Sequence, residues 1–137
     1  MSKKILVIED DPGDQKLIQM VFNKVSNNIR IDIIDDGELA FNRIKDETSQ
    51  FDYDMIILDL NLPKVEGLTL LQAIKSSEIT KDVFVVIFTT ASRGSIGKDD
   101  VIELADAFFT KPSKLKEFVE LFSSLFEKLN KQVVKNV

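Results

Sequence analysis

Apolar residues in this chain gather into short runs that predict strands. Residues 5–8, 55–58 and 83–88 are continuously apolar, which is typical of strands buried on both faces. In residues 29–33, isoleucines alternate with charged residues, so this segment predicts a half-exposed edge strand. Residues 107–109 form a short fifth strand.

Between these runs, apolar residues recur at helical spacing. The predicted helices cover roughly residues 15–25, 39–44, 68–74, 98–104 and 114–130, of which the fourth is weakly patterned. We expect Asp14 to cap the first helix and Ser113 to cap the last, because short polar side chains accept hydrogen bonds from free N–H groups at helix starts.

The alternation of five strands with five helices predicts an α/β fold, with a five-stranded parallel sheet and helices on both faces. The edge-type second strand favours the flavodoxin-like order 2-1-3-4-5, in which strands one and three lie side by side at the point of chain reversal. We expect one domain over residues 3–130, followed by a frayed C-terminal tail at residues 131–137.

Composition narrows the function classes. The chain has 137 residues, a formal net charge of -5, no cysteine and no histidine. Disulfides, thiolate or histidine metal sites and Ser-His-Asp catalysis are therefore excluded. The acidic balance disfavours nucleic acid and anionic membranes as partners. The apolar run before Glu9 is too short for a signal peptide and no transmembrane run follows, so we expect a cytoplasmic protein.

Carboxylates stand at the ends of two predicted buried strands. Glu9 and Asp10 follow the first strand, and Asp59 follows the third. Ligands bind at the carboxyl edge of such sheets, and three carboxylates there resist ionisation unless they share a cation. Oxygen ligands without histidine or cysteine suit Mg²⁺. The alternative is that Glu9, Asp10 and Asp11 form only an acidic turn that benefits from the dipole of the next helix.

A hydroxyl and a cation extend this pattern. Thr89 ends the fourth strand and Lys111 follows the fifth, although either alone would be ordinary as a strand residue or a solvated charge. Because Pro112 follows Lys111, we expect that this bond can be cis and aim the lysine back at the site. Together with the three acids, these residues predict a metal-assisted phosphoryl site with a carboxylate nucleophile.

Four motifs carry a family resemblance: IEDDP at 8–12, LDLNLP at 58–63, FTTA at 88–91 and TKP at 110–112. In this order and spacing they resemble the receiver domain of two-component response regulators, over nearly the whole chain. Residues 11–14 and 59–67 are most similar to the small stand-alone regulators paired with cyanobacterial phytochromes.

The resemblance implies a role for each matching residue. Asp59 is the implied phosphoacceptor, and Lys111 is the implied contact to a phosphoryl oxygen. Glu9 and Asp10 are the implied acidic metal pair, which holds Mg²⁺ together with Asp59 and the backbone carbonyl of Asn61.

Further matches concern the response to phosphorylation. The resemblance implies that Thr89 is the switch hydroxyl and Phe108 the aromatic switch, often a tyrosine in the family, so this chain lacks the tyrosine hydroxyl. Asn61, Thr90 and Ala91 flank the phosphate and are expected to influence the access of water to it.

The implied protein is a phosphoacceptor that assists its own phosphorylation and dephosphorylation, rather than a conventional enzyme. A sensor histidine kinase or phosphotransfer protein supplies the phosphoryl group. The surface made by the fourth helix, fifth strand and fifth helix then signals to a downstream protein. Neither nucleic acid nor membrane is implied as a partner.

The last helix carries a wide apolar stripe. It covers more of the helix than packing on a core requires, and Phe118 and Leu121 lie at its edge. This excess predicts a surface for a partner or for a homodimer.

Three alternatives share parts of this pattern. A phosphatase with an aspartyl nucleophile usually has a second aspartate two residues later, where this chain has Asn61. A flavodoxin-like FMN carrier would have the same sheet, but Glu9, Asp10 and Asp11 would repel the phosphate. A degenerate receiver that acts only as a binding module is disfavoured by the full set of acceptor residues.

Overall fold

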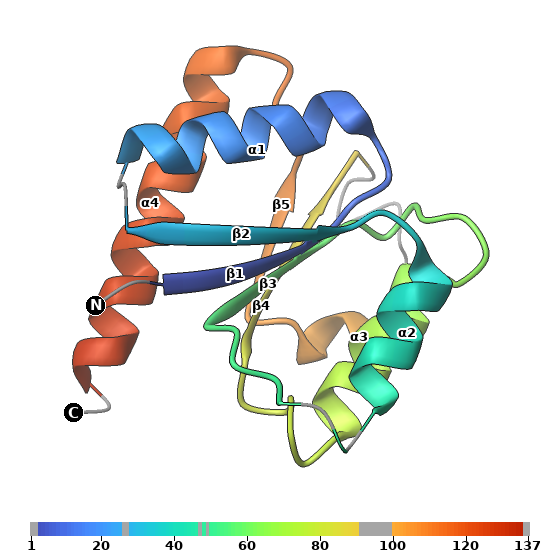
Figure 1. Ribbon diagram of the computed structural model, residues 1–137. Coiled ribbons are helices and arrows are strands. Elements are labelled where there is room, and N and C mark those ends of the chain that lie inside the picture. Colours follow the sequence, from blue (N-terminus) through green and yellow to red (C-terminus); the bar gives the residue numbers. More distant parts are fainter. Residues whose placement is uncertain (1–2, 26–27, 47, 49, 91–99, 136–137) are drawn as a thin grey trace.

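Five parallel strands form the middle layer of the computed structural model (Figure 1). It describes residues 3–25, 28–46, 48, 50–90 and 100–135, with the backbone alone for residues 100 and 130–135. The strands are β1 (Lys3–Ile8), β2 (Ile29–Ile34), β3 (Met55–Leu58), β4 (Phe84–Thr89) and β5 (Ala107–Thr110). Their order is β2-β1-β3-β4-β5, which confirms the predicted sheet and the edge position of β2.

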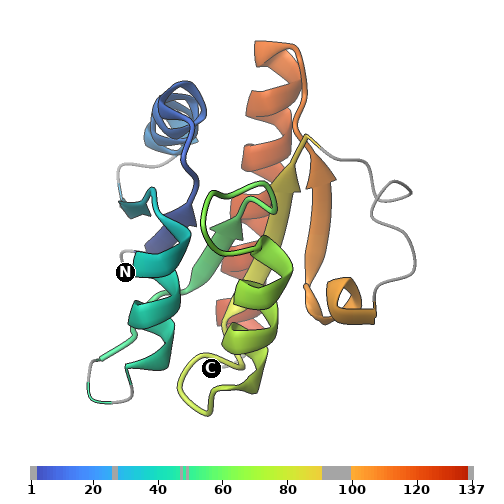
Figure 2. The same cartoon turned by 90° about the vertical axis from the view of Figure 1, so that its right-hand side faces the viewer.

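Helices cover both faces of this sheet. One face carries α1 (Pro12–Val25) and α4 (Leu115–Lys135), and the other carries α2 (Gly37–Lys45) and α3 (Gly67–Ser76). Figure 2 shows α2 and α3 in front of the strands, with a short 3₁₀ helix, η2 (Asp100–Leu104), beside β5.

The prediction of five α-helices is wrong for the described residues, which hold four. In the region predicted as the fourth helix, η2 has 3₁₀ geometry, and residues 98 and 99 lie outside the described part. Just after η2, Asp106 exchanges bonds with the backbone of Val85: its N–H donates to the Val85 carbonyl at 2.9 Å, and its carboxylate accepts from the Val85 N–H at 2.8 Å. This attachment to β4 leaves little chain in which a regular helix could continue.

The helix starts also differ from the prediction. Asp14 does not cap α1, because the helix begins at Pro12 and the Asp11 carboxylate accepts the Asp14 N–H at 2.9 Å. Proline suits the first helical position, since its fixed φ is helical and its missing N–H would have no partner there. The last helix begins at Leu115, so Ser113 lies before the cap position, and it continues to Lys135, past the predicted end near residue 130.

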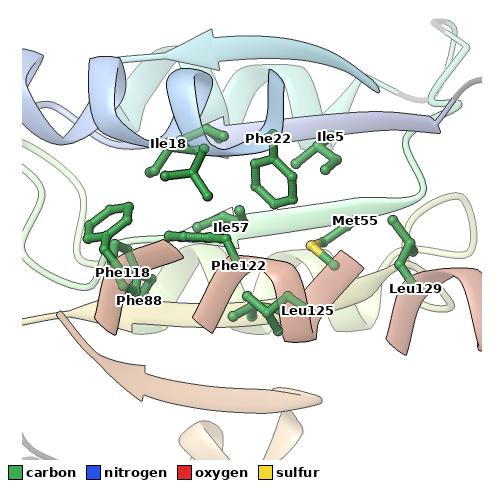
Figure 3. Close-up of a cluster of buried hydrophobic side chains, with 13 residues drawn as sticks. Ile5, Ile18, Phe22, Met55, Ile57, Phe88, Phe118, Phe122, Leu125 and Leu129 are labelled. Atoms are coloured by element: carbon green, nitrogen blue, oxygen red, sulfur yellow. The ribbon is translucent and has the colours of Figure 1, made fainter. Parts of the chain in front are cut away.

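The core forms two clusters, one on each face of the sheet. The cluster under α1 and α4 is rich in aromatic rings, which Figure 3 shows packed against one another. Phe22, Phe88, Phe118 and Phe122 have neighbouring ring centroids 4.9–5.3 Å apart. Edge-to-face contacts at this spacing stabilise beyond the burial of area alone.

This packing corrects the prediction for the last helix. Phe118, expected at a partner surface, is 3% exposed and belongs to the core, because its ring packs on Phe88 and Phe122. Leu121 is partly buried against the same cluster. Among residues 115–129 of α4, the exposed large apolar residue is Leu115, at 55%.

A search of the described helices for a membrane-spanning segment finds none with the required length and hydropathy.

Candidate functional site

Three carboxylates meet at the carboxyl edge of the sheet. One oxygen from each of Glu9, Asp10 and Asp59 lies within 4.8 Å of the others. The strands β1 and β3 position them: Ile8 lies opposite Leu58, and the Asp59 N–H donates to the Ile8 carbonyl at 3.0 Å. The site therefore lies where neighbouring strands leave the sheet in opposite directions, as expected for ligand sites in open α/β folds.

Lys111 reaches this cluster from the end of β5. Its Nζ lies 2.6 Å from Glu9 Oε1, 2.7 Å from Asp14 Oδ2 and 3.1 Å from Asp59 Oδ2. The Lys111 N–H donates to the Thr89 carbonyl at 2.7 Å, which fixes the start of the side chain beside β4. Because the ammonium is largely buried, these contacts replace its water.

The ammonium of Lys111 also lies over a ring of the aromatic core. Its Nζ is 5.8 Å from the centroid of the Phe88 ring, and Phe88 packs in turn on Phe118 and Phe122. The packing of α4 on the sheet thus helps to hold the Lys111 ammonium in place at the site.

The sequence suggested that the peptide bond before Pro112 can be cis. It is trans, since none of the described peptide bonds is cis. The lysine reaches the site through the parallel alignment of β4 and β5, in which Thr89 lies opposite Thr110.

The charges of the site are out of balance. Burial raises the pKa of Glu9 to about 7; Lys111 opposes this shift, while the charge of Asp59 adds to it. For Lys111, burial alone would lower the pKa, but the bonds to Asp14, Glu9 and Asp59 outweigh burial and hold the pKa above its usual value. One lysine therefore does not fully offset the carboxylates around it.

The same imbalance appears in the hydrogen bonds. Glu9 Oε1 is buried and, among the described residues, accepts no hydrogen bond of good geometry, although Lys111 Nζ lies 2.6 Å away. A buried carboxylate oxygen without a well-aligned donor is costly. A divalent cation among Glu9, Asp10 and Asp59 would satisfy it, and three hard oxygen donors suit Mg²⁺ or Mn²⁺. The residues present therefore fit such an ion.

Asn61 links Asp59 to the end of β4. Its N–H donates to Asp59 Oδ1 at 3.0 Å, and its Nδ2 donates to Thr89 Oγ1 at 3.3 Å and to Thr90 Oγ1 at 3.2 Å. Thr89 is fully buried and Thr90 is exposed. The residues predicted to flank a phosphate thus come together, except Ala91, which lies outside the described residues.

Phe108 lies on β5, the strand predicted to carry it. It sits opposite Ile87 in the pairing of β4 with β5 and is half-buried against the core cluster on the α2 and α3 face. Its role as a switch stays a prediction, as does the Asn61 carbonyl as a metal ligand.

Asp14 and Gly67 belong to the site although the sequence did not assign them to it. Asp14 bonds to Lys111, and the signal for this was Pro12, whose place at the first helical position puts Asp14 in the first turn above the sheet edge. Gly67 begins α3 against the backbone of Asp59 and Leu60, where a Cβ would meet Leu60 Cα at 2.4 Å.

Comparison with known proteins assigns this geometry to a family. The response regulator receiver domain family matches residues 5–123. This chain belongs to that family. Receiver domains accept phosphoryl groups on an aspartate from histidine kinases in two-component signalling and pass the signal onward.

Among its relatives, the receiver is 32% identical over 133 residues to the response regulator Rcp1 of Synechocystis sp., with 90% of this chain and 86% of Rcp1 covered. The structure of Mn²⁺-bound Rcp1 has a TM-score of 0.72 at 34% identity, covering 90% of this chain and 91% of that one. That of the phosphorylated cyanobacterial phytochrome response regulator RcpA has a TM-score of 0.77 at 30% identity, covering 93% of both chains.

Other relatives are longer proteins. The receiver is 28% identical to the DNA-binding regulator RpaA of Synechocystis sp., where the match covers 93% of this chain but 51% of RpaA. The match thus covers about half of RpaA.

Proposed function

We propose that this receiver accepts a phosphoryl group on Asp59 in a Mg²⁺-dependent reaction and signals through a conformational change to a protein partner. The observation that carries this proposal is the buried Asp59 carboxylate, which lies 3.1 Å from the Lys111 ammonium and within the three-carboxylate cluster. The receiver proposed here covers residues 3–130, and α4 continues past the predicted tail boundary to Lys135.

Glu9, Asp10 and Asp59 are the side chains that would hold the metal, together with the backbone carbonyl of Asn61. The uncompensated Glu9 oxygen supports this choice. When bound, Mg²⁺ offsets negative charge on the phosphoryl oxygens.

The remaining chemistry belongs to the chain's own residues. A carboxylate oxygen of Asp59 attacks the phosphorus of a phosphohistidine in line, so that an O–P bond forms as the P–N bond breaks and the imidazole leaves. Lys111 donates to a phosphoryl oxygen and offsets the charge that the new acyl phosphate brings to an acidic edge. The receiver thus assists its own phosphorylation and dephosphorylation without being a conventional enzyme.

Thr89 then links the phosphate to the surface. Its hydroxyl leaves the Asn61 amide, 3.3 Å away, and donates to the phosphoryl group. Phe108 moves into the space that this opens, and the face formed by η2, β5 and α4 changes.

The partners follow from this scheme. The phosphoryl donor is a sensor histidine kinase or a phosphotransfer protein. The partner that binds the face formed by η2, β5 and α4 is a downstream protein or a second copy of this chain. Neither nucleic acid nor membrane takes part, and the reaction takes place in the cytoplasm.

Intact mass after incubation with acetyl phosphate tests the proposal. We expect one phosphoryl increment that requires Mg²⁺ and disappears with a chelator or with Asp59→Asn. An increment that survives both controls would show that phosphate enters elsewhere. Absence of any increment, with acetyl phosphate and with a panel of phosphorylated histidine kinases, would contradict the proposal.

A further inference from the structure

The Lys111 ammonium lies 2.6 Å from Glu9 Oε1 inside the metal-capable cluster, and it also donates a hydrogen bond to a carboxylate outside that cluster. Asp14 Oδ2 accepts it at 2.7 Å, against 3.1 Å for Asp59 Oδ2. The cluster with converging oxygens consists of Glu9, Asp10 and Asp59, and Asp14 is not part of it. Asp14 is thus a hydrogen-bond partner of Lys111 that lies outside the candidate metal cluster.

A lysine ammonium has three N–H donors. Lys111 Nζ has three carboxylate contacts, to Glu9, Asp14 and Asp59, so each donor has one acidic neighbour. Two of these neighbours, Glu9 and Asp59, are also needed as metal ligands. A divalent cation must therefore compete with the lysine for the same oxygens.

Asp14 is fixed beside the lysine, and its side chain is more exposed than those of Glu9 and Asp59. Its N–H is held by the Asp11 carboxylate at 2.9 Å, in the first turn of α1. The Asp14 side chain remains partly exposed at 24%, whereas those of Glu9 and Asp59 are 2% and 5% exposed. A carboxylate that keeps some water carries its charge at less cost than a buried one.

We propose that Asp14 is a positioning residue, which draws the Lys111 ammonium towards α1 and so leaves Glu9 and Asp59 available to a divalent cation. This rests on the proposed function, in which those two carboxylates bind Mg²⁺. Without the Asp14 charge, the ammonium interacts more strongly with Glu9 and Asp59. It then competes more strongly with the divalent cation for their oxygens.

Calorimetric titration with Mg²⁺ alone tests this proposal on the folded, unphosphorylated protein. Asp14→Asn is expected to weaken Mg²⁺ binding by about threefold or more, the size expected for one nearby charge in a partly screened site. Asp14→Glu, which keeps the carboxylate, is expected to restore most of the affinity. The matched control is Asp35→Asn, which removes an exposed carboxylate just after β2 and is expected to leave the affinity nearly unchanged.

A double-mutant cycle separates positioning from a simple effect of charge. If Asp14 acts through Lys111, then Asp14→Asn has a much smaller effect in a Lys111→Met background, because the competing ammonium is absent. Thermal unfolding without metal checks that each variant folds, and a variant that is unfolded at the titration temperature is replaced by Asp14→Ser.

Two results would overturn the inference. Either Asp14→Asn binds Mg²⁺ as tightly as the wild type, or the loss is the same with and without Lys111. A wild type that binds no Mg²⁺ would instead overturn the proposed function from which the inference starts, so the two failures are distinguishable.

Discussion

Gly67 approaches Leu60 so closely that a Cβ on Gly67 would lie 2.4 Å from Leu60 Cα. The same Cβ would lie 2.9 Å from the carbonyl oxygen of Asp59, and the Gly67 N–H donates to the Leu60 carbonyl at 3.3 Å. The start of α3 therefore presses directly on the backbone that carries the candidate phosphoacceptor.

Gly67→Ala is expected to destabilise the protein by about 1–3 kcal/mol, because the two nearest atoms that the new Cβ would meet, Leu60 Cα and the Asp59 carbonyl oxygen, are backbone atoms that cannot turn aside. Urea unfolding measures this loss. Gly13→Ala is the control: its Cβ would meet only the Asp11 carboxylate, at 3.3 Å, and alanine favours the helix that contains it. Equal stability of the Gly67→Ala variant and the wild type would contradict the close approach.

Phe122 is the centre of the aromatic cluster on the α4 side, since its ring packs on Phe22, Phe88 and Phe118. Phe122→Ala is expected to cost about 3–5 kcal/mol through lost burial and the cavity it leaves. Phe126→Ala, at a partly buried position of the same helix, is expected to cost clearly less. Chemical denaturation ranks the two, and the reverse order would be incompatible with the packing of α4 described above.

Tyr53 and Asp32 predict a pH dependence of stability. The Tyr53 hydroxyl donates to Asp32 Oδ2 at 2.6 Å and is the main cause of a lowered pKa for Asp32. Because the folded pKa lies below the unfolded one, this contribution is present above the unfolded pKa, near 4, and is lost as the pH falls through the folded pKa.

Tyr53→Phe is therefore expected to lower the free energy of unfolding by about 1 kcal/mol at neutral pH and by progressively less below about pH 4. Urea unfolding from acidic to neutral pH measures the difference. In an Asp32→Asn background this pH dependence of the difference is expected to vanish; its persistence there would assign it to another group.

Thr89 and Thr90 make matched variants for the switch, since Asn61 Nδ2 donates to both hydroxyls but only Thr89 is buried. Thr89→Ala is expected to accept phosphate yet to lose most of the phosphorylation-induced NMR shifts in β5 and α4. Thr90→Ala is expected to keep them. A full response in Thr89→Ala would remove Thr89 from the signalling route.

The sheet and most of the site could be predicted from the sequence because they follow from rules of parallel strands. Unbroken apolar runs predicted buried strands, and the polar residues after them, such as Glu9, Asp59 and Thr89, had to meet at one edge. The alternating pattern of β2 likewise predicted its edge position, because one face of an edge strand meets water.

The errors arose where a single contact decides the structure. The role of Asp14 depended on whether α1 begins at Pro12 or three residues later, which apolar spacing does not resolve. The predicted fourth helix does not form because Asp106 is bonded to the backbone of β4. The burial of Phe118 depends on its contact with the ring of Phe88, which comes from a distant strand. Such long-range contacts leave no periodic trace in the sequence.

The account's central claim is that Asp59 itself receives the phosphoryl group. Borohydride reduces an aspartyl phosphate to homoserine, so peptide mapping after phosphorylation with Mg²⁺ and reduction tests the claim at the level of one residue. We predict homoserine at residue 59 alone. Homoserine at residue 10 or 14, or modification spread over several carboxylates while residue 59 stays aspartate, would contradict it.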